Sequence, residues 1–235
     1  MTSLVKTFGD IKHAIYINLD SRTDRRKSFE KHFNELHTSF PNDYTFIPVQ
    51  RFSAIRNEDI GAIGCSQSHA ECIRIAKANC WDYVIIFEDD AIVLHPDILV
   101  HNVNEFLKRF NDDWDVIILS GNNFRPFHVD SPEFIRVANC QCCTSYIVQR
   151  HYYDTLIRNF DDGAKKYAAS PADEHKYACD QYWKKLQMVD RWYLITPMCI
   201  IQKADYSDNC KAYTNYSSHM IEIDKSFHGI FPIPE

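Results

Sequence analysis

The stretch that decides the fold is Tyr83-Val84-Ile85-Ile86-Phe87-Glu88-Asp89-Asp90-Ala91-Ile92-Val93. Five apolar or aromatic residues run directly into three carboxylates. An unbroken apolar run with β-branched residues is typical of a strand buried on both faces, as in the middle of a parallel sheet. Because an unpaired charge is very costly to bury, we expect the three acids at the carboxyl end of this strand, where the chain leaves the sheet.

These acids predict a site at that edge of the sheet. Open α/β sheets bind their ligands outside the carboxyl ends of the strands. Clustered carboxylates repel one another, and a divalent cation relieves the repulsion. Hard oxygen ligands favour Mg²⁺ or Mn²⁺, usually with substrate phosphates completing the shell. The alternative is a solvated acidic turn, but the buried strand before the acids and the apolar run 91–94 after them favour a site.

Length and composition narrow the class of protein. The chain has 235 residues, 45% of them hydrophobic, which favours one α/β domain over two small ones. A formal charge of −6 argues against a general nucleic-acid-binding protein. The sequence contains no apolar run long enough to cross a membrane and no pattern of a secretory signal. We therefore expect a cytoplasmic protein without a membrane span.

The nine cysteines follow no regular framework, and without an export signal they are expected to be reduced. Cys140, Cys142 and Cys143 form the densest group. No second Cys-x-x-Cys pair and no His-x₃-His pair accompany this group, so the sequence predicts buried thiols rather than a zinc site.

The rest of the chain alternates between apolar runs and amphipathic segments. Strands are predicted at 14–19, 44–52, 114–121, 134–137, 144–148, 193–195 and 198–201, with 134–137 and 144–148 as a hairpin or as neighbours. Pro48 indicates an edge or a bulge for the second of these strands. Helices are predicted from residue 23, at 70–79 with Ser66 as N-cap, and at 103–110, 151–160 and 173–186. The helix at 151–160 is expected to close at 161–163. We interpret 1–235 as a single domain with an irregular polar C-terminal tail from about residue 203.

Arg22, Arg25 and Arg26 lie at the beginning of the first predicted helix. Cations at a helix N-terminus oppose the macrodipole, so their placement calls for an anion. A diphosphate is one candidate, and nearby acids are the alternative. The small-residue segment 61–69 also offers free backbone amides to an anion, although His69 by itself is more typical of a packed histidine.

Six segments, in order along the chain, resemble motifs of glycosyltransferase family 25, the family of bacterial lipooligosaccharide transferases and collagen hydroxylysine galactosyltransferases. They are Ile17-Asn18-Leu19-Asp20 with Asp24-Arg25, Gly64-Cys65-Ser66-Gln67-Ser68-His69, Phe87-Glu88-Asp89-Asp90, Thr144-Ser145-Tyr146-Ile147-Val148, Cys179-Asp180-Gln181, and Gln202 with Ser207-Asp208. The resemblance covers about residues 12 to 210. Two departures are Ser145, where alanine is usual, and an acidic triplet that begins with Glu88, which leaves open which acid contacts the metal.

The resemblance implies a GT-A fold with a mostly parallel central sheet flanked by helices, a UDP-sugar donor and a divalent cation, most often Mn²⁺, with Mg²⁺ as the other candidate. It implies inversion at the anomeric carbon and transfer of galactose or glucose. The acceptor implied is a glycan, as in lipopolysaccharide biosynthesis, or a hydroxylysine of a collagen-like protein. Neither the sugar, the acceptor nor the oligomeric state can be read from the sequence.

The resemblance also implies roles for individual residues. Asp90 is expected to contact the metal directly, with Glu88 as the second candidate ligand. Glu88 and Asp89 would serve ribose or water-mediated metal contacts. The nucleotide side of the site would be lined by Asn18, Arg25, Ser68 and His69.

Inversion by direct displacement needs one carboxylate beside the acceptor hydroxyl to take its proton. Asp180, remote in sequence from the triplet and flanked by apolar residues, is our candidate for this base. Asp173 and Glu174 are its rivals. The alternative for Asp180 is an ion pair within its own helix, with Lys176 or Lys184 at four-residue spacing.

Two other functions fit an acidic triplet after a strand. Metal-dependent phosphohydrolases use this pattern, but they usually need further histidine or aspartate ligands close to the first acids, and none is evident near Asp89 or Asp90. A non-catalytic glycan-binding protein on the same fold is the second alternative. The presence of Glu88, Asp89, Asp90 and Asp180 argues against such a degenerate copy.

Overall fold

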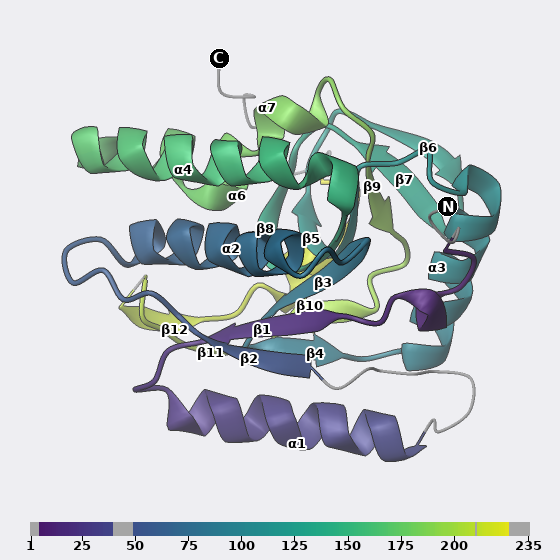
Figure 1. Ribbon diagram of the computed structural model, residues 1–235, viewed down its shortest axis with the longest axis horizontal. Helices are drawn as coiled ribbons and strands as arrows, with labels where there is room; N and C mark the ends of the chain where they lie inside the picture. Colours follow the sequence, from purple (N-terminus) through teal and green to yellow (C-terminus); the bar gives the residue numbers. More distant parts are fainter. Residues whose placement is uncertain (1–4, 40–48, 210, 226–235) are drawn as a thin grey trace.

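A computed structural model describes residues 5–39, 49–209 and 211–225 of the chain. It confirms the α/β class: an eight-stranded sheet lies between two layers of helices (Figure 1). The strand order is β2-β1-β3-β8-β5-β9-β7-β6. β8 and β7 run against their neighbours, and the remaining strands of this sheet share one direction.

The main sheet consists of β1 (Ala14–Asn18), β2 (Val49–Ser53), β3 (Tyr83–Glu88), β5 (Val116–Asn123), β6 (Phe127–Ser131), β7 (Phe134–Val137), β8 (Cys140–Gln149) and β9 (Trp192–Ile195). Two short antiparallel pairs accompany it, β4 (Ala91–Val93) with β10 (Ile200–Gln202), and β11 (Asp205–Ser207) with β12 (Ala212–Thr214). The helices are α1 (Thr23–Ser39), α2 (Gly61–Ala78), α3 (Pro96–Phe110), α4 (Tyr153–Ala169), α5 (Glu174–Tyr177), α6 (Cys179–Tyr182), α7 (Lys184–Gln187) and α8 (Ser217–Ile221), with 3₁₀ turns at Phe8–Asp10, Arg150–Tyr152 and Pro171–Asp173.

The continuous apolar run of β3 has partners on both faces of the sheet. Val84 and Ile86 pack in the core under α2 and α4, whereas Ile85 and Phe87 pack in the core that includes α1 and α3. Successive side chains of a strand point to opposite faces, so a strand covered on both sides must be apolar at every position. This arrangement confirms the expectation of a buried central strand whose acids lie at its carboxyl end.

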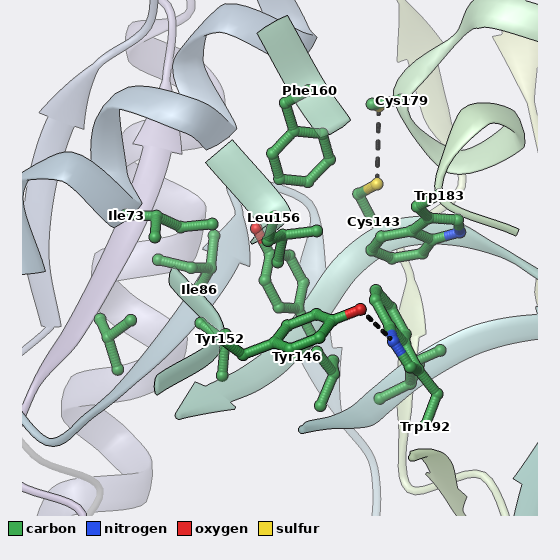
Figure 2. Packing of buried hydrophobic residues seen from close by; sticks show 14 of the residues in the cluster. Ile73, Ile86, Cys143, Tyr146, Tyr152, Leu156, Phe160, Cys179, Trp183 and Trp192 are labelled. Atoms are coloured by element: carbon green, nitrogen blue, oxygen red, sulfur yellow. Dashed lines mark hydrogen bonds between the residues drawn. The ribbon is translucent and has the colours of Figure 1, made fainter. Parts of the chain in front are cut away.

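Large aromatic rings fill the core on the α2 and α4 side (Figure 2). Trp183 and Trp192 meet edge to face with ring centroids 5.2 Å apart, and Tyr146 meets Trp183 in the same way at 5.7 Å. The Trp192 indole donates to the hydroxyl of Tyr152 at 3.2 Å. These contacts fix the 179–187 segment against β8 and β9. The position of Asp180 depends on this packing.

Two helix boundaries differ from the prediction. α2 begins at Gly61, so Ser66 lies inside the helix and its hydroxyl donates to the carbonyl of Ala62 at 3.0 Å instead of capping the N-terminus. α4 continues through Gly163 to Ala169. A Cβ on Gly163 would lie 2.9 Å from the Tyr182 ring, so this glycine permits a close approach and does not end the helix.

Three further segments also differ. The predicted helix at 173–186 is interrupted by extended backbone at Ala178 and is divided into α5, α6 and α7. Segment 134–137 forms β7, which pairs with β6 and β9, so the hairpin with 144–148 is wrong; β8 lies between β3 and β5. Of the strand predicted at 44–52, residues 44–48 lie outside the described residues, and the rest belongs to β2 at the sheet edge.

The region after residue 203, expected to be irregular, contains β11, β12 and α8. Over the stretches that the structure describes, none of the helices combines the length and the apolar character needed to cross a membrane.

Candidate functional site

The acidic triplet at the end of β3 is divided between the two faces of the sheet. Glu88 continues the face of Val84 and Ile86, and its Oε1 lies 3.4 Å from Nε2 of His69 on α2. Asp89 takes the opposite face, where it accepts from Arg25 of α1. The two-residue period of the strand therefore separates side chains that are adjacent in sequence and that we expected to act together.

Asp90 is a buried carboxylate with one unsatisfied oxygen. Its Oδ2 accepts from Arg25 Nη1 at 3.1 Å and from Gln202 Nε2 at 2.9 Å. Its Oδ1 is buried and has no hydrogen-bond partner. Burial, and then the negative charge of Glu88, raises the pKa of Asp90 to about 7. A buried acceptor without a donor is costly to keep, and a divalent cation is a group that would satisfy it.

Arg25 connects Asp89 and Asp90, which follow β3, to strand β11. Its Nη1 also donates to Asp89 Oδ1 at 3.0 Å, its Nε donates to Asp205 Oδ2 at 3.2 Å, and its Nη2 donates to the carbonyl of Tyr206 at 2.9 Å. The predicted anion at the start of α1 is thus supplied by carboxylates of β3 and β11. Two acids closer in sequence, Asp20 and Glu30, pair instead with Arg51 and Arg26.

Asn18, at the end of β1, orients Asp89. Its amide donates to Asp89 Oδ2 at 2.6 Å and to the carbonyl of Arg22 at 3.0 Å, while its Oδ1 accepts from Arg51 Nε at 3.0 Å. β1 and β3 are parallel neighbours, so their carboxyl ends bring Asn18 and Asp89 together. Burial raises the pKa of Asp89, and the hydrogen bond from Asn18 and the charge of Arg25 oppose that rise.

The Gly64–His69 segment contacts its surroundings with two sides of the helix, because residues four apart share one side. Gly64 and Ser68 contact the segment that follows β2. The Ser68 hydroxyl accepts from the amide of Ile55 at 2.8 Å and donates to the carbonyl of Gly64 at 2.7 Å. Ser68 is expected to line the nucleotide side, but its hydroxyl forms hydrogen bonds with backbone groups. Cys65 and His69 form the other face, toward Glu88.

We expect Gly64→Ala to destabilise the fold, because its Cβ would lie 2.3 Å from the backbone carbonyl oxygen of Ile55. Overpacking of this kind costs about 1–3 kcal/mol, measured as the free energy of unfolding in urea. Gly61→Ala in the same helix is the matched control, since its Cβ would meet only the movable side chain of Asn209. Equal destabilisation by the two variants would contradict the claim that Gly64 is needed for the close approach of the Ile55 carbonyl to α2.

His69 is completely buried between Tyr146 and Glu88. Its Nδ1 lies 3.0 Å from the Tyr146 hydroxyl on β8, and its Nε2 faces Glu88. The other oxygen of Glu88 accepts from Thr144 Oγ1 at 3.3 Å. His69 and Glu88, both assigned to the donor side from the resemblance, therefore meet on the α2 side of the sheet, opposite to the side of Asp89 and Arg25.

Asp180 is the second residue of α6 and is half-buried beside β8. Its Oδ2 accepts from the amide of Cys142 at 3.0 Å. Burial, followed by the neighbouring Cys179, raises the pKa of Asp180 to about 6. Lys184, proposed as its ion-pair partner, donates instead to the side chains of Gln141 and Gln181.

The other proposed partner of Asp180, Lys176, pairs with Asp173 at 2.9 Å. Asp173, the first rival for the base, is thus engaged in an ion pair, and the second rival, Glu174, is exposed. Asp180 stays the candidate base, because it is half-buried and its pKa is raised toward neutrality.

Sequence reasoning missed several neighbours of these acids. Gln202 on β10 reaches Asp90 from 112 residues away, and Asp205 on β11 reaches Arg25 from 180 residues away. Thr144 and Tyr146 reach Glu88 and His69 from β8. Gln202, Thr144 and Tyr146 carried a signal, because they belong to segments that resemble family 25, whereas Asp205 carried none.

A cavity of about 210 Å³ borders Asp89 and Asp90 on the α1 side. It is also lined by Ser28, Phe29, Lys31, His32, Glu35, Ala91, Ile92 and Lys203. Ligand pockets usually measure about 300–1,000 Å³, so we do not assign a nucleotide sugar to this cavity alone.

No protein-family model and no curated protein matches the chain. Among solved structures, the chain is similar to a glycosyltransferase involved in the glycosylation of the major capsid of PBCV-1, with a TM-score of 0.50, 9% identity and coverage of 81% of this chain and 92% of that one. It also matches A197 from STIV (TM-score 0.44, 12% identity, 78% and 81% covered) and UDP-glucose pyrophosphorylase complexed with UDP-glucose (TM-score 0.43, 7% identity, 93% and 98% covered). The first likeness confirms the expected GT-A-type fold, and at this identity it shows the fold alone.

Proposed function

We propose that this protein is an inverting, metal-dependent glycosyltransferase that moves galactose or glucose from a UDP-sugar to a glycan or to a hydroxylysine of a protein. One observation carries the proposal: the buried Asp90, with an unpartnered oxygen, lies beside Asp89 and Arg25 at the carboxyl edge of parallel strands. The resemblance of six segments to family 25 and the fold shared with the PBCV-1 glycosyltransferase support it.

Asp90 fits a divalent metal because its Oδ1 lacks any other partner and its burial disfavours an uncompensated charge. Carboxylate oxygens suit Mn²⁺ or Mg²⁺. Such a metal would supply electrophilic help to a departing diphosphate. Glu88, proposed from the sequence as the second ligand, directs its carboxylate toward α2, so we place the main metal contact on Asp90.

The surrounding residues have separate tasks in this proposal. Asn18 holds Asp89 in place by a hydrogen bond of 2.6 Å, so that Asp89 can accept from a ribose hydroxyl or from a metal-bound water. Arg25 keeps the two aspartates together and offers positive charge near a diphosphate. Ser68 and His69, which the resemblance places on the nucleotide side, are given no nucleotide contact here, because Ser68 bonds to the backbone of Ile55 and Gly64 and His69 faces Glu88 on the α2 side.

Asp180 is proposed as the general base. A base works best when its pKa lies near the working pH, and burial raises the pKa of Asp180 to about 6. The Cys142 amide orients its Oδ2. The ionised Asp180 would take the proton of the acceptor hydroxyl as that hydroxyl attacks the sugar.

A screen of UDP-sugars tests the proposal. The protein is incubated with UDP-galactose or UDP-glucose and Mn²⁺, and released UDP is measured, since transfer to water reveals the donor without a known acceptor. We expect UDP release from one of these donors, lost in EDTA. Phosphate release from simple phosphoesters would favour the phosphohydrolase, and donor binding without any turnover would favour the non-catalytic alternative.

Arg25→Ala is expected to weaken UDP binding by about 10- to 100-fold, because charge-assisted hydrogen bonds are worth about 1.5–3 kcal/mol. The affinity is measured by calorimetry at fixed salt with Mn²⁺ present. Arg26→Ala is the matched control, because Arg26 pairs with Glu30 on the exposed face of the same helix. Unchanged UDP affinity in Arg25→Ala would mean that Arg25 serves only to pair with Asp89, Asp90 and Asp205.

A further inference from the structure

Two thiols, an imidazole and a carboxylate gather on the α2 side of the sheet. Cys65 and His69 come from α2, Glu88 from the end of β3, and Cys179 from the start of α6. One ligand atom from each of Cys65, His69 and Glu88 lies within 4.8 Å of the others. Cys179 Sγ lies 3.8 Å from Cys65 Sγ but outside this group of three, so its side chain must shift inward to reach an ion that the other three hold. The group thus joins three segments that are far apart in sequence.

Three separations within this group match those of a tetrahedral zinc site. With Zn–S of about 2.3 Å and Zn–N or Zn–O of about 2.0–2.1 Å, tetrahedral ligands lie about 3.8 Å apart for two sulfurs, about 3.6 Å for sulfur and oxygen, and about 3.4 Å for nitrogen and oxygen. The structure has 3.8 Å between the sulfurs of Cys65 and Cys179, 3.6 Å between Cys65 Sγ and Glu88 Oε1, and 3.4 Å between His69 Nε2 and Glu88 Oε1.

The ligand atoms are oriented by their neighbours. Cys65 and His69 are four residues apart, a spacing that places two helical metal ligands on one face. His69 Nδ1 lies 3.0 Å from the Tyr146 hydroxyl, which leaves Nε2 directed to the site, and Thr144 holds the second oxygen of Glu88. Metal-binding histidines usually have their other ring nitrogen hydrogen-bonded in this way.

We propose that Cys65, His69, Glu88 and Cys179 bind one Zn²⁺ ion. Binding displaces the protons of the two thiols, since thiolates are the metal-ligating form. Four protein ligands close the coordination shell, which is typical of a structural zinc. The ion would tie α2 and β3 to α6 and so would fix the position of Asp180, which follows Cys179. Thiolate and imidazole ligands select zinc, whereas the all-oxygen environment of Asp89 and Asp90 suits Mn²⁺.

Cys143 provides the competing explanation. Its sulfur lies 3.5 Å from that of Cys179 (Figure 2), and two thiols so close to each other would form a disulfide after modest movement. In the zinc-bound protein Cys179 is occupied, and Cys143 remains a free thiol beside it. The metal content and the state of Cys143 therefore separate the two explanations.

Cobalt substitution of the wild-type protein is the first test, because it does not depend on any variant folding. The full chain is stripped of metal under reducing conditions and titrated with Co²⁺. We expect one equivalent to produce the intense visible absorption of tetrahedral cobalt and a thiolate-to-cobalt charge-transfer band, both abolished by one equivalent of Zn²⁺. Absence of the charge-transfer band, or a protein purified with a Cys143–Cys179 disulfide and without zinc, would overturn the proposal.

Variants then identify the ligands through zinc affinity measured by competition with a chromogenic chelator. Cys65→Ser and Cys179→Ser should each weaken zinc binding by more than about 100-fold, beyond the 10- to 100-fold effect typical of an outer-shell partner, which we expect for Tyr146→Phe. Cys143→Ser should leave the affinity unchanged, as should Cys80→Ser at an exposed cysteine. Loss of zinc in Cys143→Ser with retention in Cys65→Ser would contradict this ligand set.

Discussion

Asp90→Asn is expected to reduce Mn²⁺-dependent UDP-sugar turnover by about a thousand-fold or more. A metal acting as a Lewis acid supplies several kcal/mol of transition-state stabilisation, and each 1.4 kcal/mol is tenfold in rate. Asparagine keeps the shape of the side chain but removes the charge that would hold the cation. Turnover is measured as UDP release with Mn²⁺, and Mn²⁺ binding is followed in parallel by electron paramagnetic resonance.

The matched control is Asp24→Asn. Asp24 is an exposed aspartate on α1 that pairs with Arg22. It should retain wild-type turnover. Because burial already favours the neutral form of Asp90, Asp90→Asn should fold normally, and circular dichroism would verify this. Full turnover by Asp90→Asn, or by the wild type in EDTA, would show that the chemistry does not use a metal at this position.

Asp180→Asn is expected to lower transfer by about 10²–10⁴-fold, the usual contribution of general base catalysis. Binding of Mn²⁺ and UDP should be unchanged, because Asp180, on α6 beside β8, is proposed to act on the acceptor hydroxyl alone. The amide side chain can still accept from Cys142, so the local backbone is preserved. Calorimetry with UDP and a transfer assay separate binding from chemistry.

The pH dependence provides an independent readout of the same residue. A general base works in its ionised form, so with a pKa of about 6 turnover should rise as the pH increases through about 6 and level off above it. Asp180→Asn should abolish that rise, whereas Asp173→Asn should keep it. Transfer by Asp180→Asn within a few-fold of the wild type would transfer the role of base to Asp173 or Glu174.

The central strand and the position of its acids could be predicted from sequence because both depend on local chemistry. A strand covered on both faces must be apolar throughout, and its charges must lie where the chain emerges. The division of the triplet was also implicit in the two-residue period: Glu88 follows Ile86 and Asp89 follows Phe87. We missed it because we treated the three carboxylates as one group.

Other features depend on contacts that no local pattern records. Gly163 reads as a helix terminator, yet it lies inside α4 because the Tyr182 ring packs against it. Residue spacing alone predicts that Cys140, Cys142 and Cys143 are buried thiols and do not bind zinc. In the structure Cys143 meets Cys179, which in turn meets Cys65 from 114 residues away. Such clusters form only when the sheet order brings β3 beside β8 and α6 packs against β8 and α2.

The most direct test of the central claim is a calorimetric titration of UDP into the wild-type protein and into Asp90→Asn, each with and without Mn²⁺. The account predicts that Mn²⁺ strengthens UDP binding to the wild type by at least about tenfold, a coupling of about 1.4 kcal/mol, and has little effect in Asp90→Asn. Equal UDP affinity with and without Mn²⁺ in the wild type, or the same enhancement in Asp90→Asn, would contradict a metal-bridged nucleotide site at the end of β3.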